Sequence, residues 1–168
     1  MKKLIFTVAT ILTATFGVKA QNQVGATVGL FQVGEESISF NLMGLSAFGK
    51  HELNDNLRIG ANVGYYSKEV FPGISLISMP IMGLIEYKRN INKLTSFGGL
   101  EVGINRLGAS GEGQTDATNN LAFAPVVGFE YELSKQLDVV LNAKYNYIMT
   151  EGNATKGLGL NVGVAYKL

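Results

Sequence analysis

Alternation of apolar residues with small or polar ones, at every second position, is the feature of this sequence that most restricts its fold. Over 57–66, one set of positions holds Leu, Ile, Ala, Val and Tyr, and the other holds Arg, Gly, Asn, Gly and Tyr. The same pattern recurs over 138–147 and 158–168. A period of two is typical of β-strands with two different faces. The longest apolar run after residue 21, at 76–85, is too short for a membrane-spanning helix and contains Pro80. We therefore predict an all-β chain.

Eight segments fit this pattern, and the connections between them are of two kinds. Three are short polar turns that lead into a leucine, and four are looser segments rich in Gly, Ser and Thr. This arrangement predicts an eight-stranded antiparallel up-and-down barrel with both ends of the mature chain on the short-turn side. The predicted strands cover 23–33, 37–50, 57–68, 75–88, 94–107, 121–133, 137–149 and 157–168. The predicted turns cover 52–57, 87–94 and 132–137, and the predicted loops cover 34–37, 68–74, 108–120 and 149–156. The segments 37–50 and 75–88 are apolar on both faces, which leaves their facing open.

The first 20 residues have the pattern of a secretory signal peptide. Lys2 and Lys3 precede an apolar stretch, and Val18-Lys19-Ala20 resembles a cleavage site. We therefore expect a signal peptide at 1–20 and a single barrel domain at 21–168. Cleavage would remove three lysines, which takes the 14 basic residues to 11 against 13 acidic ones and gives a net charge of about −2. A nucleic-acid partner is not expected at this charge.

The composition of the polar face favours a barrel in a membrane over a soluble one. A soluble barrel shows charged residues to water, whereas the polar face here is mostly Gly and Asn with isolated charges. The alternative is that apolar side chains face lipid and the small residues fill a narrow lumen, while closure satisfies all backbone groups. We therefore predict a transmembrane β-barrel.

Aromatic residues near the ends of the predicted strands agree with this arrangement. Outer-membrane barrels carry aromatic girdles at both membrane interfaces, although Tyr also favours strands in general. The predicted girdle residues next to the short turns are Tyr87, Phe129, Tyr131 and Tyr166. Those at the opposite strand ends are Tyr65, Tyr145 and Tyr147.

Two segments resemble a known family. Residues 75–87, Ser-Leu-Ile-Ser-Met-Pro-Ile-Met-Gly-Leu-Ile-Glu-Tyr, resemble the proline-containing fourth strand of the outer-membrane β-barrel domain common in Bacteroidetes. Residues 127–134 resemble its sixth strand and turn. The resemblance covers about residues 21–168 and implies a small, porin-like barrel without naming an activity. The chain departs from many such barrels because it ends in Tyr166-Lys167-Leu168 rather than on an aromatic residue.

Charged residues on the predicted inward faces are the main candidates for a functional site. Buried charges must pair with opposite charges and form hydrogen bonds. An ion or proton path is the alternative, but eight strands usually leave room only for side chains, so a structural network is favoured. The predicted members of this network are Arg58, Glu86, Glu101, Glu130 and Lys144.

Catalytic, cofactor-binding and metal-binding residues are not predicted. A lipid-deacylating barrel would need a His beside a Ser, and the only histidine, His51, lies beside a short turn on the side opposite to that chemistry. The acidic loop 108–120 matches no calcium-loop spacing.

We therefore expect a non-enzymatic integral outer-membrane protein with a packed lumen, a structural or surface-interaction role and periplasmic termini. The alternatives are an accessory factor in envelope assembly or secretion, then a lipid A-modifying enzyme, then a periplasmic ligand-binding barrel. The expected partners are outer-membrane lipid, the machinery that assembles barrels, and an envelope or extracellular protein of unknown identity.

Overall fold

The computed structural model describes residues 22–35, 38–111, 114–150 and 153–168. The predicted signal peptide lies outside these described residues. No helix in the described ranges is long and apolar enough to cross a bilayer. The strands are β1 (Asn22–Glu35), β2 (Ile38–Glu52), β3 (Leu57–Phe71), β4 (Ile74–Ile91), β5 (Leu94–Gly111), β6 (Gln114–Glu132), β7 (Leu137–Thr150) and β8 (Asn153–Lys167).

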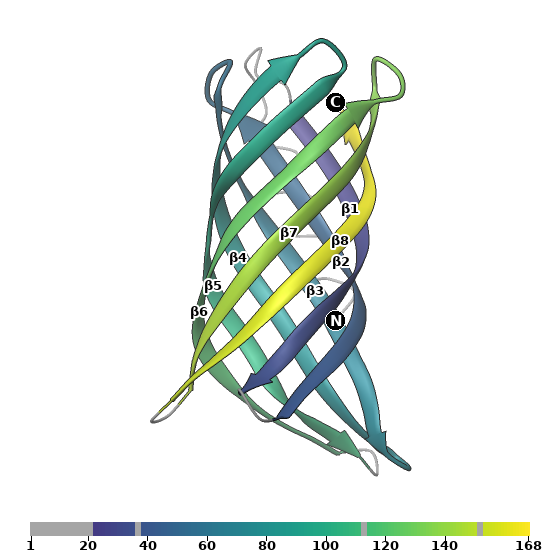
Figure 1. Ribbon diagram of the computed structural model, residues 1–168, viewed down its shortest axis with the longest axis vertical. Helices are drawn as coiled ribbons and strands as arrows, with labels where there is room; N and C mark the ends of the chain where they lie inside the picture. The colour runs from purple at the N-terminus through teal and green to yellow at the C-terminus, as the bar shows by residue number, and fades with distance from the viewer. Residues whose placement is uncertain (1–21, 36–37, 112–113, 151–152) are drawn as a thin grey trace, which may run out of the picture.

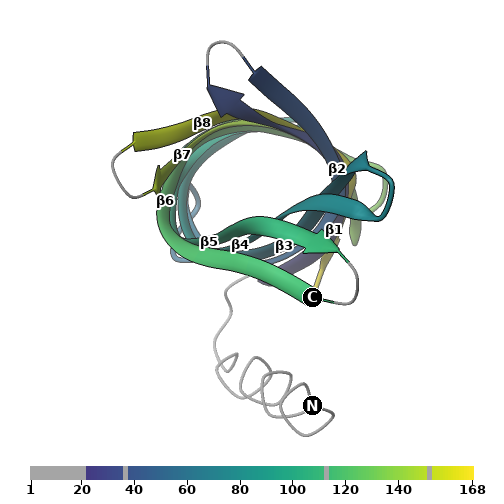
Figure 2. The same ribbon diagram turned by 90° about the horizontal axis from the view of Figure 1, so that it is seen from below.

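The eight strands form one closed antiparallel barrel in which each strand pairs with its neighbours in sequence. β8 closes the ring by pairing with β1, beginning at Gln23↔Lys167. The strands are steeply tilted in Figure 1 and make a continuous ring in Figure 2. Where a strand is paired on both sides, its backbone donors and acceptors need no solvent. The predicted up-and-down barrel is confirmed.

The two faces of each strand differ as the alternation predicts. On β3, Arg58 and Asn62 are buried in the lumen, whereas Ile59 and Val63 are exposed on the outside. The structure also settles the facing that the sequence leaves open. Leu42, Ser46 and Lys50 of β2 point inward, as do Met82, Leu84 and Glu86 of β4. These strands are apolar on both faces because part of the lumen is itself apolar.

Two prolines lie within strands, each at an interruption in the pairing with one neighbour. The β3–β4 register skips the position of Pro80, between Val63↔Ile81 and Tyr66↔Ser78. The β6–β7 register skips Pro125 in the same way. Because proline has no N–H to donate, it is tolerated only where one ladder bond is absent.

Inward-facing glycines let neighbouring strands approach closely. A Cβ added at Gly103 would lie 2.1 Å from the carbonyl oxygen of Ile81 on β4, and one at Gly163 would lie 2.0 Å from that of Ala26 on β1. The outward-facing Gly98 is different, because its nearest neighbours would be 3.8 Å away. The small residues on the polar face are therefore a steric requirement of this narrow barrel.

The three short connections form two types of turn. At 53–56 and 133–136 the chain makes the same four-residue turn, in which the N–H of Leu53 or Leu133 donates to the carbonyl oxygen of Leu57 or Leu137, at 2.9 Å in each case. The third connection is tighter, because β4 and β5 remain paired until only Asn92 and Lys93 separate them. Asn92 adopts a φ of 55°, a left-handed conformation that asparagine tolerates.

The predicted loops at the other end are largely wrong. Residues 108–120 are mostly paired strand, with Gly108 opposite Ala117 and Asn105 opposite Asn120. The predicted loop at 68–74 contracts to a turn at 72–73, where Gly73 has a φ of 77°. At 34–37, β1 extends two residues beyond its predicted end, and at 149–156 both β7 and β8 extend beyond theirs. Glycine and polar residues at these positions indicated a solvent-exposed segment, and this led to the prediction of loops. Such residues do not prevent the backbone from pairing as a strand.

The outside of the barrel carries a continuous apolar band. The following outward residues of β8, and Leu168 directly after it, are all exposed: Leu158, Leu160, Val162, Val164 and Tyr166. At about 3.3 Å per residue and a tilt of about 40°, this stretch spans about 25 Å along the barrel axis. That height matches the apolar band of outer-membrane barrels.

Candidate functional site

A compact network of two cations and two anions occupies the lumen on the short-turn side. Arg58 donates to both carboxylate oxygens of Glu130, at 2.7 and 2.8 Å, and its Nε lies 2.5 Å from Glu86. Lys50 lies 3.1 Å from Glu86 and 3.2 Å from Glu130. Gln23 adds a hydrogen bond of 3.3 Å to Glu130. The four charges sum to zero, and each cation contacts both carboxylates.

Burial makes this neutrality necessary. Arg58 and Glu86 are each 2% exposed, and Glu130 is 3% exposed. An unpaired charge would be strongly unfavourable in such a position. The cations also lie over aromatic rings, since Lys50 is 4.5 Å and Arg58 is 4.9 Å from the ring centre of Phe97. Such contacts favour a cation further where it is desolvated.

A second ion pair lies deeper in the barrel. Lys144 donates to Glu101 at 2.6 Å, and Asn62 donates to the same carboxylate at 3.4 Å. Other amides continue this polar layer: Asn161 donates to Asn142 at 3.0 Å and accepts a hydrogen bond of 2.9 Å from Tyr66. The five predicted network residues therefore form two groups, with Arg58, Glu86 and Glu130 in one and Glu101 and Lys144 in the other.

The lumen opens into a vestibule on the short-turn side. This cavity has a volume of about 380 Å³ and reaches down to Arg58 and Glu130. Its rim carries further ion pairs: Lys88 with Glu52, and Lys167 with both Asp138, at 2.9 Å, and Glu132, at 3.2 Å. Deeper in the barrel, a cavity of only about 10 Å³ lies between the two charged layers. Another, of about 20 Å³, lies beyond the second layer, beside Phe31 and Tyr66. Spaces of that size hold about one water molecule each.

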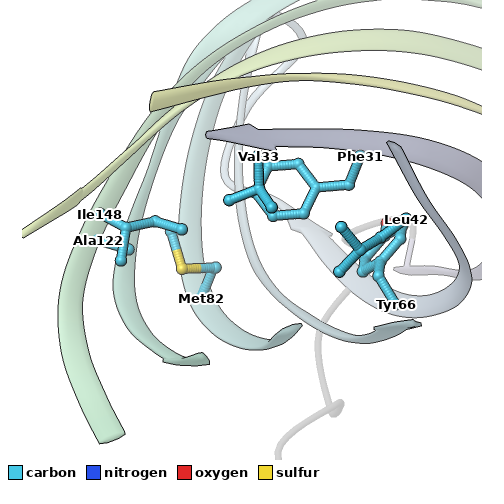
Figure 3. Packing of buried hydrophobic residues seen from close by; sticks show 7 residues of the cluster. All are labelled: Phe31, Val33, Leu42, Tyr66, Met82, Ala122 and Ile148. Atoms are coloured by element: carbon cyan, nitrogen blue, oxygen red, sulfur yellow. The ribbon is translucent and has the colours of Figure 1, made fainter. Parts of the chain in front are cut away.

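An apolar cluster fills the lumen toward the opposite end, and we call it the apolar plug. Figure 3 shows its side chains projecting inward from several strands around the barrel. Phe31 meets Tyr66 edge to face, with ring centres 5.8 Å apart. The buried members of the plug are Phe31, Val33, Leu42, Tyr66, Met82, Ala122 and Ile148. Charged layers and the apolar plug together leave no wide passage through the described barrel.

The predicted girdle residues all lie on the outside of the barrel. Tyr87, Phe129, Tyr131 and Tyr166 are exposed near the short turns. At the opposite strand ends Tyr65 and Tyr145 are exposed, and Tyr147 is partly covered because it stacks on Phe123, with ring centres 4.8 Å apart. Phe71, which was not predicted, is 67% exposed beyond this second group.

Some residues of the site were not predicted from the sequence. Lys50 was missed because the facing of its strand was open, although the buried positions Leu42 and Ser46 share its parity. Gln23 and Phe97 carry no charge and gave no signal. His51 lies near the vestibule, where its Nδ1 is 2.7 Å from the side-chain oxygen of Asn22. The described residues contain no group of three or more His, Asp or Glu side chains that could hold a metal ion.

Comparison with protein families gives one match that covers almost the whole chain. The family model described as outer membrane protein beta-barrel domain matches residues 4–167. No curated protein matches the sequence.

Several solved structures share this architecture. Neisserial surface protein A is 18% identical, with a TM-score of 0.75 over 88% of this chain and 97% of that one. Ail, the attachment invasion locus protein of Yersinia pestis, is 15% identical, with a TM-score of 0.64 over 90% of this chain and 100% of that one. OprG from Pseudomonas aeruginosa is 13% identical, with a TM-score of 0.59 over 90% and 98%. At these identities the likeness concerns the fold alone.

Proposed function

Because the chain belongs to the outer membrane protein beta-barrel domain family and forms an integral outer-membrane barrel, we propose that it acts there without enzymatic activity, as a structural or surface-interaction protein. The observation that carries this proposal is a lumen filled by side chains within an apolar outer band. Two charged layers and an apolar plug occupy the space that a solute would need. Function is therefore assigned to the outer surface and the strand ends.

A packed lumen has a measurable consequence. Purified barrel, folded into vesicles, is expected to leave them impermeable to sugars and to give no steady unit conductance in planar bilayers. Folding is checked on the same sample by the shift in gel mobility between unheated and boiled protein, which reports a closed barrel. A regular conductance from barrel that passes this check would contradict the packed-lumen proposal.

Orientation in the membrane is the second part of the proposal. Barrels of this kind have short periplasmic turns. We therefore propose a periplasmic position for both mature termini and for the turns at 53–56, 92–93 and 133–136. The chain has no cysteine, so a single introduced thiol can report orientation without background. In intact cells a membrane-impermeant maleimide is expected to label Asn119→Cys and not Asp55→Cys. Labelling of Asp55→Cys and not of Asn119→Cys would show that the barrel has the opposite orientation in the membrane.

The partners follow from this placement. The apolar band is assigned to outer-membrane lipid, with the two aromatic groups at its interfaces, and insertion is assigned to the barrel assembly machinery. The Pro80-containing strand β4 also supports membership in the Bacteroidetes group of these barrels. The lipid assignment predicts that the folded protein fractionates with the outer membrane and resists extraction by alkaline carbonate, whereas release into the soluble periplasmic fraction would contradict it.

A further inference from the structure

Two neighbouring strands, β5 and β6, extend well beyond the apolar band at the end opposite the short turns, and β4 continues beside β5 as far as Ile74. On β5 the last exposed aliphatic residue is Ile104, yet the strand continues to Gly111. On β6 the corresponding residue is Leu121, and the strand already begins at Gln114. At about 3.3 Å per residue and a tilt of about 40°, this extension rises about 15–20 Å above the band.

One edge of the extension has no strand beside it in the described part of the chain. Pairing between β6 and β7 ends at Leu121↔Met149, and β7 turns into β8 after Thr150. Residues 114–120 therefore pair only with β5. In both views the ends of β7 and β8 lie away from those of β5 and β6 (Figures 1 and 2). We call residues 114–120 the open edge.

The open edge is a template for another strand. In an antiparallel pair, successive residues direct their N–H and C=O groups alternately to either side, so about half of these groups face away from β5. At the turns, Glu132 donates toward β5 and Leu133 toward β7. The unbroken β5–β6 register carries this alternation up the strand, so the backbone groups of Thr115, Ala117 and Asn119 face away from β5. Main-chain groups of an added strand could pair with these three residues, as in β-strand addition.

The open edge is less protected than the other edge of the extension. Natural proteins block exposed edges with charged side chains, above all lysine, with proline or with short strand length. Residues 114–120, Gln-Thr-Asp-Ala-Thr-Asn-Asn, contain neither lysine nor proline. On the β3 side, pairing with β2 ends at Ser67, and only 68–71 continue. That edge carries Lys68 and Glu69 and ends before Pro72.

The charge on the open edge indicates its occupant. Asp116 is exposed and is the only charged residue in 114–120. A second copy in the same membrane would share the orientation of the first, so two β6 strands could meet only in parallel, and in register this would place the two Asp116 carboxylates together. An antiparallel strand from another molecule avoids that repulsion and can place a cation opposite Asp116.

We propose that the open edge of β6 binds an extended segment of another protein by antiparallel strand addition, with a lysine or arginine opposite Asp116. The extracellular placement of this site rests on the proposed function. The binding itself does not, because it can be measured on purified barrel in nanodiscs, so failure of the binding and failure of the orientation are separate results.

The probe is a short fluorescent peptide of alternating threonine and valine, with one lysine placed opposite Asp116 in antiparallel register. Binding is measured by fluorescence anisotropy, and the register by disulfide trapping between Asn119→Cys and a cysteine in the peptide. We expect Asp116→Lys to weaken binding on the order of tenfold, and a peptide with glutamate in place of lysine to recover it. Glu69→Lys, an equal charge change on the protected edge, is the control and is expected to leave binding unchanged.

Three results would overturn the proposal. The first is no binding of the lysine peptide at millimolar concentration to barrel that passes the gel-mobility check. The second is equal binding to the wild-type barrel and to Asp116→Lys, which would place the peptide elsewhere. The third is concentration-dependent dimerisation that Asp116→Lys abolishes, which would make a second copy the occupant. Register-specific trapping at Asn119→Cys together with the charge-swap recovery would establish it.

Discussion

Removal of the Arg58 side chain tests the lumen network most directly. Arg58 holds Glu130 through two hydrogen bonds and contacts Glu86 through its Nε, and all three residues are almost completely buried. In Arg58→Ala, Lys50 remains as the only cation beside two carboxylates, so the network carries a net charge of −1. Breaking a buried ion pair by removing one partner typically costs about 3–5 kcal/mol. Since the vestibule can supply water to this site, we expect the lower end, about 3 kcal/mol.

The double variant Arg58→Ala/Glu130→Ala separates charge imbalance from loss of contacts. It leaves Lys50 and Glu86 as a neutral pair, 3.1 Å apart. The double variant is therefore expected to be less destabilised than the sum of the two single variants, with a coupling of at least about 2 kcal/mol. Glu132→Ala is the matched control, because its ion pair with Lys167 lies at the solvated rim, where such pairs contribute about 0–1 kcal/mol.

The assay is urea unfolding in lipid vesicles, with the folded fraction read from gel mobility without boiling. Gel mobility suits this protein because it has no tryptophan to report folding by fluorescence. If Arg58→Ala unfolds within about 0.5 kcal/mol of the wild type, or if the single effects add in the double variant, the network does not stabilise the barrel as described.

Two further predictions use the same assay. Gly103→Ala is expected to destabilise the barrel by about 1–3 kcal/mol, because its Cβ would lie 2.1 Å from a β4 carbonyl oxygen, whereas Gly98→Ala should stay within about 0.5 kcal/mol. Equal effects would refute the close-approach argument. Val162→Arg, in the middle of the apolar band, is expected to cost about 2–4 kcal/mol, and Leu168→Arg at the band's end at most about 1 kcal/mol. Equal tolerance at both positions would contradict a lipid-facing band.

The number, order and facing of most strands could be predicted because they depend on local chemistry. A period of two assigns each side chain to a face without knowledge of its partners. The four-residue turns at 53–56 and 133–136 could also be predicted, because each is followed by a leucine with which the next strand begins. The turn at 92–93 was predicted too long, since Lys88, Arg89 and Asn90 are polar although they lie in a paired strand.

Strand ends could not be predicted for a related reason. Once β5 and β6 leave the apolar band, their side chains no longer need an apolar face, so their sequence becomes polar and, in β5, contains glycine. Backbone pairing continues, because each strand already has an aligned neighbour and every added residue extends an existing ladder. The composition therefore predicts where the apolar band ends, but only the strand pairing shows where the sheet ends. The open edge is the part of β6 between these two positions.

The partners within the lumen depend on barrel geometry rather than on local pattern. Arg58 on β3 meets Glu130 on β6, which is three strands away around the wall and 72 positions away in sequence. Such a contact requires that both side chains reach the same height inside the barrel, and height depends on the stagger between all the intervening strands. The alternation along each strand predicted that five charged residues face the lumen. Which of them form ion pairs depends on the strand registers, by which Glu86 and Glu130 both contact Arg58, whereas Glu101 contacts Lys144. The contacts between side chains in the lumen thus depend on the closure of the whole barrel. This explains why Lys50 can complete the network although the sequence of its own strand does not predict that role.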